Sequence, residues 1–258
     1  MAQKRGPKRI KTTGTVFDIV EHVKSNTSCT LTDIATDLDI SKSTVHAHLQ
    51  TLRDRGYVIE EDGEYRLGLR FFSLGGHVRQ NEPYGKLYQM GKPEIDELVE
   101  TTDERAQIVV EEQGFGFYLY QARGNRAVLA DTHTGTRIPL HSTAVGKAIL
   151  STLPEERVET IVSRHGLPAD TPRTTTDPDE LFDELDRIRD RGCAFDRGER
   201  VVGVRCVAAP IELDELPIAA GVSVSIPKLR RSDTFFEDRL PELVANAARI
   251  IGLNTTYY

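Results

Sequence analysis

Three side chains in the C-terminal half could serve in covalent catalysis: the thiol of Cys206, the hydroxyl of Ser142 and the imidazole of His141. A nucleophile must lie within hydrogen-bond reach of its base, and a third group must orient that base. His141 and Ser142 are adjacent, so in an extended segment their side chains would point to opposite faces. The sequence has no Gly-x-Ser-x-Gly elbow, phosphate-binding loop or zinc-type His/Cys spacing. We therefore expect no catalytic residue, no cofactor and no metal, and keep an enzyme with a cysteine or serine nucleophile as an alternative.

A second group of polar side chains has the spacing of one helix face. Val45, Leu49 and Leu52 recur at i, i+4 and i+7, which predicts a buried stripe on a helix that Ser41 can cap. The opposite face would carry small and hydrogen-bonding side chains, which suit base edges and phosphates in a major groove. These side chains are Lys42, Ser43, His46, Ala47 and Gln50. A solvent-exposed polar face has the same pattern, so this helix alone leaves both interpretations open.

The elements around this helix favour the DNA interpretation. Apolar spacing predicts one helix over residues 16–23 and a second from Thr30, where Asp33 makes a weak relative of a capping box. A four-residue turn then leads into the third helix, as in a helix-turn-helix. Strand-like residues 57–59 and 65–67 flank the turn signal Asp62-Gly63, which predicts a hairpin. Three helices followed by a hairpin are the winged arrangement.

Charges of both signs lie on the predicted wing. Arg66 on the returning strand could contact phosphate, whereas the acidic tip at 60–62 would be repelled, so we expect contact at the base of the wing. The residues predicted to contact DNA are Thr30, Lys42, Ser43, Thr44, His46, Ala47, Gln50 and Arg66.

The net charge of −7 hides an uneven distribution of charge. Residues 1–80 carry a net charge of +2, and the remainder carries −9. The first eleven residues hold five positive charges and no acid, which predicts a basic disordered arm over 1–11. Acids outnumber bases overall, and the nine lysines are far fewer than the arginines, which favours adaptation to high salt over ordinary acidic drift.

Several classes of protein are disfavoured by composition. No apolar run reaches the length of a membrane span, and the N-terminus has no hydrophobic signal core. The three cysteines, Cys29, Cys193 and Cys206, form no Cys-x-x-Cys pair. We therefore expect a cytoplasmic protein without membrane contact.

Three stretches of the chain carry a resemblance to a known family. The first covers residues 31–35 and 41–52, followed by Arg55-Gly56-Tyr57-Val58; the second is 138–150; the third comprises 191–196, 203–210 and 219–225. In this order behind a winged helix, the sequence resembles the IclR family of bacterial and archaeal regulators over residues 12–253. One departure is Ser225-Ile226-Pro227, where the family often has Ser-Gly-Pro. A β-branched residue there predicts a regular strand end.

The resemblance implies an α+β fold, in which a winged helix-turn-helix is joined by a linker helix to a GAF-like domain with an antiparallel sheet. We expect the DNA-binding domain over 12–69, the linker helix over 70–82 and the effector-binding domain over 83–258. The linker contains Gly75-Gly76, which could form a hinge or allow close helix packing. In the family this helix also takes part in a dimer contact.

The resemblance further implies a small-molecule site in the second domain. The family's effectors are mostly small acids, aromatic acids or sugar derivatives, and a helix beginning near Ala144 could hold an acid at its N-terminus. The residues expected at this site are Ile138, Ser142, Thr143, Ala144, Val145, Asp196, Val204, Cys206, Ser223 and Ser225. Three alternatives stay open: Ser142 and Thr143 could only cap the helix, Cys206 could only pack in the core, and Asp196 could only cap a turn.

The function predicted from these observations is sequence-specific transcriptional regulation, controlled by an effector from a catabolic pathway. Its partners would be a double-stranded DNA operator, the effector and further copies of the chain, in a homodimer or a dimer of dimers. An effector-independent architectural DNA-binding protein is the second alternative, but it leaves the large second domain without a role.

Overall fold

The computed structural model describes residues 10–26, 28–125, 127, 132–213 and 216–257. The chain divides into two compact units, residues 1–78 and 79–258. Nine residues of the predicted basic arm, 1–9, lie outside the described part. The arm was expected to reach residue 11, but Lys11 already begins the first helix.

The first unit is a winged helix-turn-helix, as predicted. Its elements in chain order are α1 (Lys11–Ser25), β1 (Cys29–Thr30), α2 (Leu31–Asp37), α3 (Lys42–Asp54), β2 (Val58–Glu61) and β3 (Glu64–Leu67). The strands form an antiparallel sheet in the order β1-β3-β2, and the short β1 was not anticipated. Asp62 and Gly63 have φ angles of 51° and 80°, as a two-residue hairpin turn of the primed type requires. Ile19, Ile34, Val45 and other apolar residues fill the core.

Helix α4 (Arg70–Gln80) runs through the segment expected to be the linker. A Cβ atom added at Gly75 or Gly76 would meet no described atom within 4 Å, so neither glycine serves close packing within the described chain. The hinge interpretation of the glycine pair remains a prediction.

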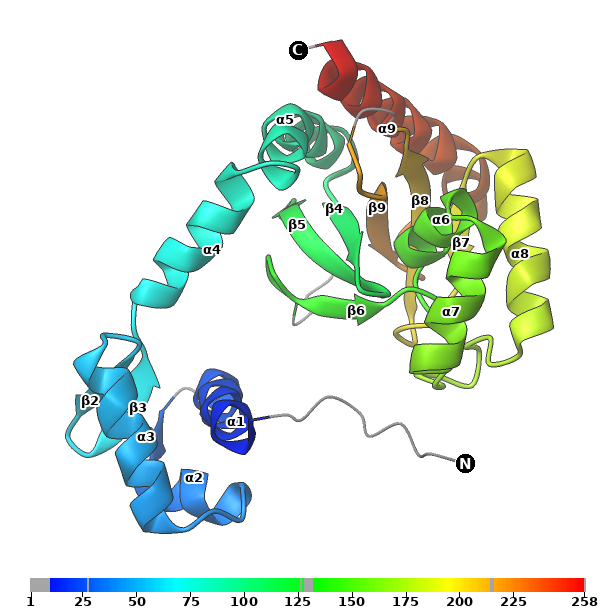
Figure 1. Ribbon diagram of the computed structural model, residues 1–258. Helices are drawn as coiled ribbons and strands as arrows, with labels where there is room; N and C mark the ends of the chain where they lie inside the picture. Colours follow the sequence, from blue (N-terminus) through cyan, green and yellow to red (C-terminus); the bar gives the residue numbers. More distant parts are fainter. Residues whose placement is uncertain (1–9, 27, 126, 128–131, 214–215, 258) are drawn as a thin grey trace. The chain divides into compact units, whose positions relative to one another are not determined.

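The second unit is built on one antiparallel sheet in the order β6-β5-β4-β9-β8-β7 (Figure 1). Its elements are α5 (Tyr84–Thr102), β4 (Arg105–Glu112), β5 (Phe115–Arg123), β6 (Arg137–Pro139), α6 (Ala144–Thr152), α7 (Glu155–His165), α8 (Pro178–Arg191), β7 (Ala194–Asp196), β8 (Val204–Ile211), β9 (Ala220–Pro227), the π-helical turn η1 (Phe235–Arg239) and α9 (Leu240–Tyr257). Ile226 is paired with Arg205 within the β8–β9 ladder, which confirms the regular strand end predicted there.

Helices cover both faces of this sheet. The side chains along each strand alternate between two hydrophobic cores, one on each face. On β4, Ala106, Ile108 and Val110 pack with α5 and α9, whereas Val109 packs with α6 and α8 on the other face. Figure 1 shows α5 and α9 on one side of the sheet and α6, α7 and α8 on the other. Gln107 shares the α6 side with Val109, and this side carries the polar groups described below.

Candidate DNA-reading face and effector cavity

Helix α3 has the two faces that its sequence predicts. Val45, Leu49 and Leu52 are buried in the core of the first unit. Lys42, Ser43, His46, Ala47 and Gln50 are exposed. The side chains of Lys42, His46 and Gln50 form no hydrogen bond or ion pair with the described residues, so they are available to an external partner.

The N-terminus of α3 is organised by Ser41. Its Oγ accepts a hydrogen bond from the backbone N–H of Thr44 at 3.2 Å, and it lies 3.1 Å from Ser43 Oγ and 2.8 Å from Thr44 Oγ1. Ser41 therefore caps the helix as expected. The hydroxyls of Ser43 and Thr44 are therefore already hydrogen-bonded to Ser41, although both residues are exposed.

Thr30 forms a full capping box at the start of α2. The backbone N–H of Asp33 donates to Thr30 Oγ1, and the Asp33 carboxylate accepts from the backbone N–H of Thr30 at 2.9 Å. The hydrogen bonds from the backbone and hydroxyl of Thr30 lower the pKa of Asp33. The backbone N–H and the hydroxyl of Thr30 both donate to the Asp33 carboxylate, so a phosphate would have to compete with this acid for them.

Two acids of the wing are paired with arginines, one on the wing itself and one on α3. Arg66 Nη2 lies 2.8 Å from Glu61 Oε1, and Arg53 forms an ion pair with Glu60. Both side chains of the Arg66–Glu61 pair are largely exposed. A DNA phosphate would therefore have to compete with Glu61 for Arg66.

A cavity of about 510 Å³ opens in the second unit, between the sheet and the start of α6. Nine of the ten predicted effector residues line it: Ile138, Thr143, Ala144, Val145, Asp196, Val204, Cys206, Ser223 and Ser225. The tenth, Ser142, is fully buried and donates a hydrogen bond to Asp170 Oδ2 at 2.7 Å. Ser142 thus supports a cavity residue and does not line the cavity itself. Thr143 lines the cavity and also caps α6, because its Oγ1 accepts a hydrogen bond from the N–H of Gly146.

Strand register places a polar row across the cavity floor. Asp196 is paired with Cys206, Cys206 with Ser225, and Ser225 with Arg105. The row therefore runs from an acid on β7 to a guanidinium on β4. Adjacent strands are about 4.8 Å apart, so its two ends are separated by roughly 14 Å at the backbone. A small molecule lying on the floor would meet opposite charges at its two ends.

Arg105 is almost completely buried at the β4 end of this row. Burial lowers the pKa of its guanidinium, but an arginine in a protein keeps its charge. Its Nη2 donates to the backbone carbonyl of Thr132 at 2.8 Å and also contacts Gln121 Oε1. These contacts fix a positive charge in the cavity wall.

Asp196 forms the other end of the row and also caps a turn. Its Oδ1 accepts hydrogen bonds from the backbone N–H groups of Gly198 at 2.8 Å and Glu199 at 2.6 Å. Burial raises the pKa of Asp196 to about 6, although these two N–H groups and Lys147 favour the carboxylate. The cavity and turn-capping roles therefore coexist in one side chain.

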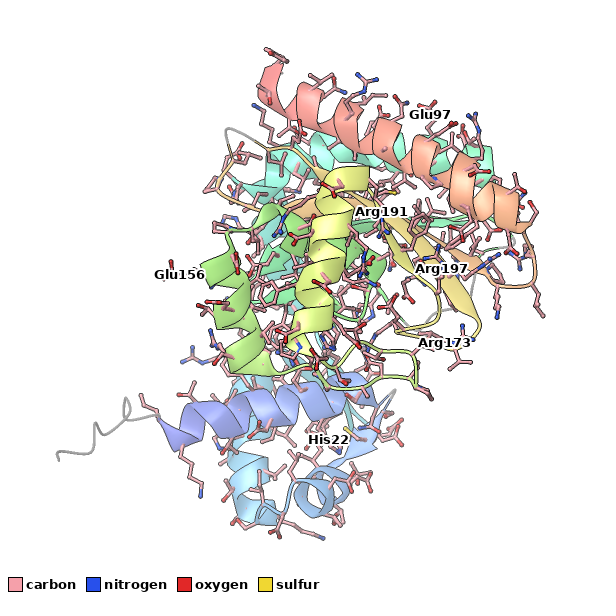
Figure 2. All side chains as sticks on the ribbon, turned by 90° about the vertical axis from the view of Figure 1, so that its right-hand side faces the viewer. His22, Glu97, Glu156, Arg173, Arg191 and Arg197 are labelled. Carbon is pink, nitrogen blue, oxygen red and sulfur yellow. The ribbon has the colours of Figure 1, made fainter. Side chains whose placement is uncertain are left out.

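Two loops beside the cavity are fastened to each other. Thr171 and Thr174 on the α7–α8 loop both donate to the carbonyl oxygen of Glu199, at 3.1 and 2.6 Å. Arg173 Nη1 donates to the carbonyl oxygen of Arg197 at 2.8 Å (Figure 2). These bonds join the α7–α8 loop to the turn that Asp196 caps.

The cavity-facing members of these loops are also paired. Arg200 Nη1 lies 2.6 Å from Asp170 Oδ1, so each loop contributes one charge to the same ion pair. Asp170 and Arg200 both line the cavity. This pair adds no net charge to the cavity wall.

The groups considered for catalysis are not arranged as nucleophile and base. His141 Nε2 donates to the carbonyl oxygen of Pro168 at 3.0 Å, and Ser142 is bonded to Asp170 instead. Burial lowers the pKa of His141. Cys206 Sγ donates to Ser225 Oγ at 3.2 Å, and burial raises the pKa of its thiol. A thiol held in this protonated form is a poor nucleophile.

Seven cavity residues were missed by sequence reasoning: Arg105, Gln107, Tyr118, Thr132, Asp170, Arg200 and Val201. A pattern in the sequence could have identified two of these residues. Arg105 and Gln107 are polar residues in alternation on a strand that is otherwise apolar at 106, 108, 109 and 110, and buried polar residues in strands require partners. The loop residues Asp170 and Arg200 carry no such pattern.

Two family models cover most of the chain. The one described as "IclR helix-turn-helix domain" matches residues 16–62, and the one described as "Bacterial transcriptional regulator IclR C-terminal" matches residues 85–253. The chain belongs to the IclR family. It is therefore a transcriptional regulator with a helix-turn-helix DNA-binding domain and an effector-binding C-terminal domain, as the sequence predicted.

Individual IclR relatives extend over nearly the whole chain. A probable HTH-type transcriptional regulator, ArcR, from Halobacterium salinarum is 34% identical over 95% of this chain and 94% of its own. The organism of this relative supports the predicted halophilic origin. The crystal structure of the IclR protein of Thermotoga maritima has a TM-score of 0.79 at 25% identity, over 96% of this chain and 100% of that one. The crystal structure of an IclR homologue from Microbacterium hydrocarbonoxydans, complexed with 4-hydroxybenzoate, has a TM-score of 0.80 at 23% identity. The match covers 96% of this chain and 100% of that one.

Across the described residues, we find no helix that combines the length and the apolar character needed to span a bilayer.

Proposed function

We propose that Lys42, His46, Ala47 and Gln50 read the operator in the major groove, while Ser43, Thr44, Thr30 and Arg66 contact its phosphates. The observation that carries this proposal is the exposed, unpaired face of α3 opposite its buried stripe. Hydrogen-bonding side chains near the N-terminus of a recognition helix are the groups that contact base edges in this motif.

The cavity of the second unit is the effector site, and its ligand is a small carboxylic acid. A volume of about 510 Å³ is in the range of small-molecule sites. Arg105 lines this cavity and holds the carboxylate of the ligand. The 4-hydroxybenzoate bound by the homologue from Microbacterium is a small carboxylic acid and supports this ligand class.

The regulator acts in the cytoplasm as a homodimer or a dimer of dimers. Two copies would place two reading helices in successive major grooves of a palindromic operator. Helix α4 supports self-association, because Phe72, Leu74 and Val78 expose apolar surface along it. Effector binding would change the DNA affinity only to the extent that the ligand prefers one pose of the reading helices.

One experiment tests both halves of the proposal. An operator is first selected from a random-sequence library, and its binding is followed by fluorescence anisotropy with and without small carboxylic acids. The Arg105→Met variant should keep operator affinity but lose the response to acids, whereas Gln50→Ala should lose operator preference and keep thermal stabilisation by acids. A response that survives in Arg105→Met would contradict the carboxylate assignment.

A further inference from the structure

Gln50 carries an unengaged amide on the exposed face of α3. At about 100° per residue, it lies roughly 130° around the helix from the centre of the buried stripe. The residue is exposed, and its side chain forms no hydrogen bond or ion pair with the described residues. An amide has an acceptor oxygen and a donor NH2 group in one plane, so Gln50 can bind two neighbouring groups of a partner at the same time.

Ala47 leaves room beside this amide. It lies three residues earlier on the same exposed face, about 4.5 Å along the helix axis and about 60° around it from Gln50. Its side chain is a single methyl group, so a flat partner can approach the helix closely here. The two residues together therefore offer a hydrogen-bonding amide next to a small apolar group.

The charges along α3 limit the part of the helix that can approach DNA. Residues 42–50 include Lys42 and no acid, and the one acid in the sequence of the helix is Asp54, at its last position. The positive end of the helix dipole adds to the charge of Lys42, whereas Asp54 repels phosphates. The segment that can enter a major groove is therefore 42–50, which contains both Ala47 and Gln50.

Among the four bases, adenine complements a bidentate amide in the major groove. Adenine presents the N7 acceptor beside the N6 amino donor, whereas guanine presents two acceptors, and cytosine and thymine present one hydrogen-bonding group each. The apolar group in this groove is the thymine methyl. Neighbouring base pairs are about 3.4 Å apart, close to the axial separation of Ala47 and Gln50. The amide and the methyl group therefore match two adjacent A·T pairs.

We propose that each operator half-site contains an adenine that forms two hydrogen bonds with Gln50, next to a base pair whose thymine methyl packs against Ala47. Gln50 Nε2 donates to adenine N7, and Gln50 Oε1 accepts from the N6 amino group. This inference rests on the proposed reading role of α3 and specifies two adjacent base pairs of its operator.

Selection of operators from a random library with the full-length protein tests the inference. The unmodified protein should enrich an adenine in each half-site, directly beside a second A·T pair. Gln50→Lys should change that adenine to guanine and leave the other positions as they were, because lysine donates to guanine O6 and N7. Thr51→Lys is the matched control, since it adds the same charge at an exposed position about 100° further around the helix. It should strengthen binding to all sequences without changing the enriched bases.

Modified bases in the selected operator identify the contacting atoms, with fluorescence anisotropy as the readout. 7-Deazaadenine removes the N7 acceptor and should weaken binding of the unmodified protein about fivefold, but it should not affect Gln50→Ala. Deoxyuridine in place of the neighbouring thymidine removes the methyl group and should weaken binding about fourfold. Ala47→Gly should lose this sensitivity to the methyl group. Both modified bases should have little effect when they are placed outside the half-site.

The possible failures are distinguishable. If the Gln50 variants change a position at which the unmodified protein selects guanine, cytosine or thymine, the inference is wrong but α3 remains the reading helix. The inference is equally wrong if 7-deazaadenine affects the unmodified protein and Gln50→Ala alike, or affects neither. If deoxyuridine binds as tightly as thymidine, the Ala47 contact is wrong. If no sequence is enriched, or no Gln50 variant changes any preference, the proposed reading role of Gln50 fails together with the inference.

Discussion

Lys147 Nζ lies 2.7 Å from Glu199 Oε1 and 2.6 Å from Oε2, and the two side chains are only 4% and 13% exposed. Lys147 belongs to α6, which also carries the cavity residues Ala144 and Val145. Glu199 belongs to the turn that Asp196 caps. The ion pair therefore links the helix on one side of the cavity to the turn on another.

Breaking this pair from one side should destabilise the second unit. Lys147→Met leaves the Glu199 carboxylate buried without its cation, and the expected loss in the free energy of unfolding is roughly 3 kcal/mol. Chemical denaturation measures it. The double variant Lys147→Met/Glu199→Gln should recover most of the loss, and Arg239→Met, which removes one member of an exposed pair, should cost about 0.5 kcal/mol or less. Equal losses in all three would contradict the assignment of a buried link.

Replacing the reading side chains should relax sequence preference more than it weakens non-specific binding. His46→Ala and Gln50→Ala are each expected to cost about 1–3 kcal/mol on the selected operator and little on scrambled DNA, because base contacts carry the discrimination. Competition anisotropy with both DNAs measures the difference. Ser25→Ala, at the exposed end of α1, serves as control. Unchanged discrimination in both variants would show that another surface reads the bases.

Removing the basic arm should act on all DNA sequences alike. A chain that starts at residue 10 lacks Lys4, Arg5, Lys8 and Arg9. For every phosphate that the arm neutralises, its removal should reduce the slope of log affinity against log salt by about 0.9, while the ratio of specific to non-specific affinity stays constant. A salt series on both DNAs checks this, and a change confined to the operator would contradict it.

The acidic wing should restrain DNA binding through Arg66. Glu61→Gln releases Arg66 from its partner and removes a charge that repels phosphate, so the affinity for any DNA should rise by up to about 1 kcal/mol. Arg66→Ala should lower it, and the Glu61→Gln/Arg66→Ala double variant tells whether the gain comes through Arg66. A gain that persists undiminished in the double variant would instead indicate simple loss of repulsion.

Asp196 should make the second unit more stable in mild acid than at neutral pH. Its pKa is raised to about 6 by burial, so the folded state binds a proton that the unfolded state, with a pKa near 3.8, has already released. Stability should therefore fall as the pH rises from about 4 through 6 and level off above, by roughly 3 kcal/mol in total. The difference between the unmodified protein and Asp196→Asn, followed by denaturation from pH 4 to 8, isolates this contribution. Asp54→Asn, at an exposed position of α3, should show no such difference.

Local patterns were sufficient for most elements of the fold. The stripe of Val45, Leu49 and Leu52 needs only the helical period to be recognised, and Asp62-Gly63 needs only the φ preferences of a hairpin turn. Asp177-Pro178 and Gly192 likewise begin and end α8 as their residue types predict. Each of these signals lies within one helix or turn, so it can be recognised from neighbouring residues in the sequence.

The ligand cavity depends on contacts that no local pattern contains. Nine of its residues were expected from the family resemblance. The alternation on β4 marks Arg105 and Gln107 as polar residues of a buried strand, but only the β4–β9 register places Gln107 beside Ser223 and Ser225, more than a hundred positions along the chain. Ser142 was assigned to the cavity because of its neighbours in sequence, and its side chain points to Asp170 instead. The sequence by itself determined which helix can read DNA, because helical periodicity is local. Which polar groups face the effector was decided by the tertiary structure, because strand register and loop pairing join distant residues.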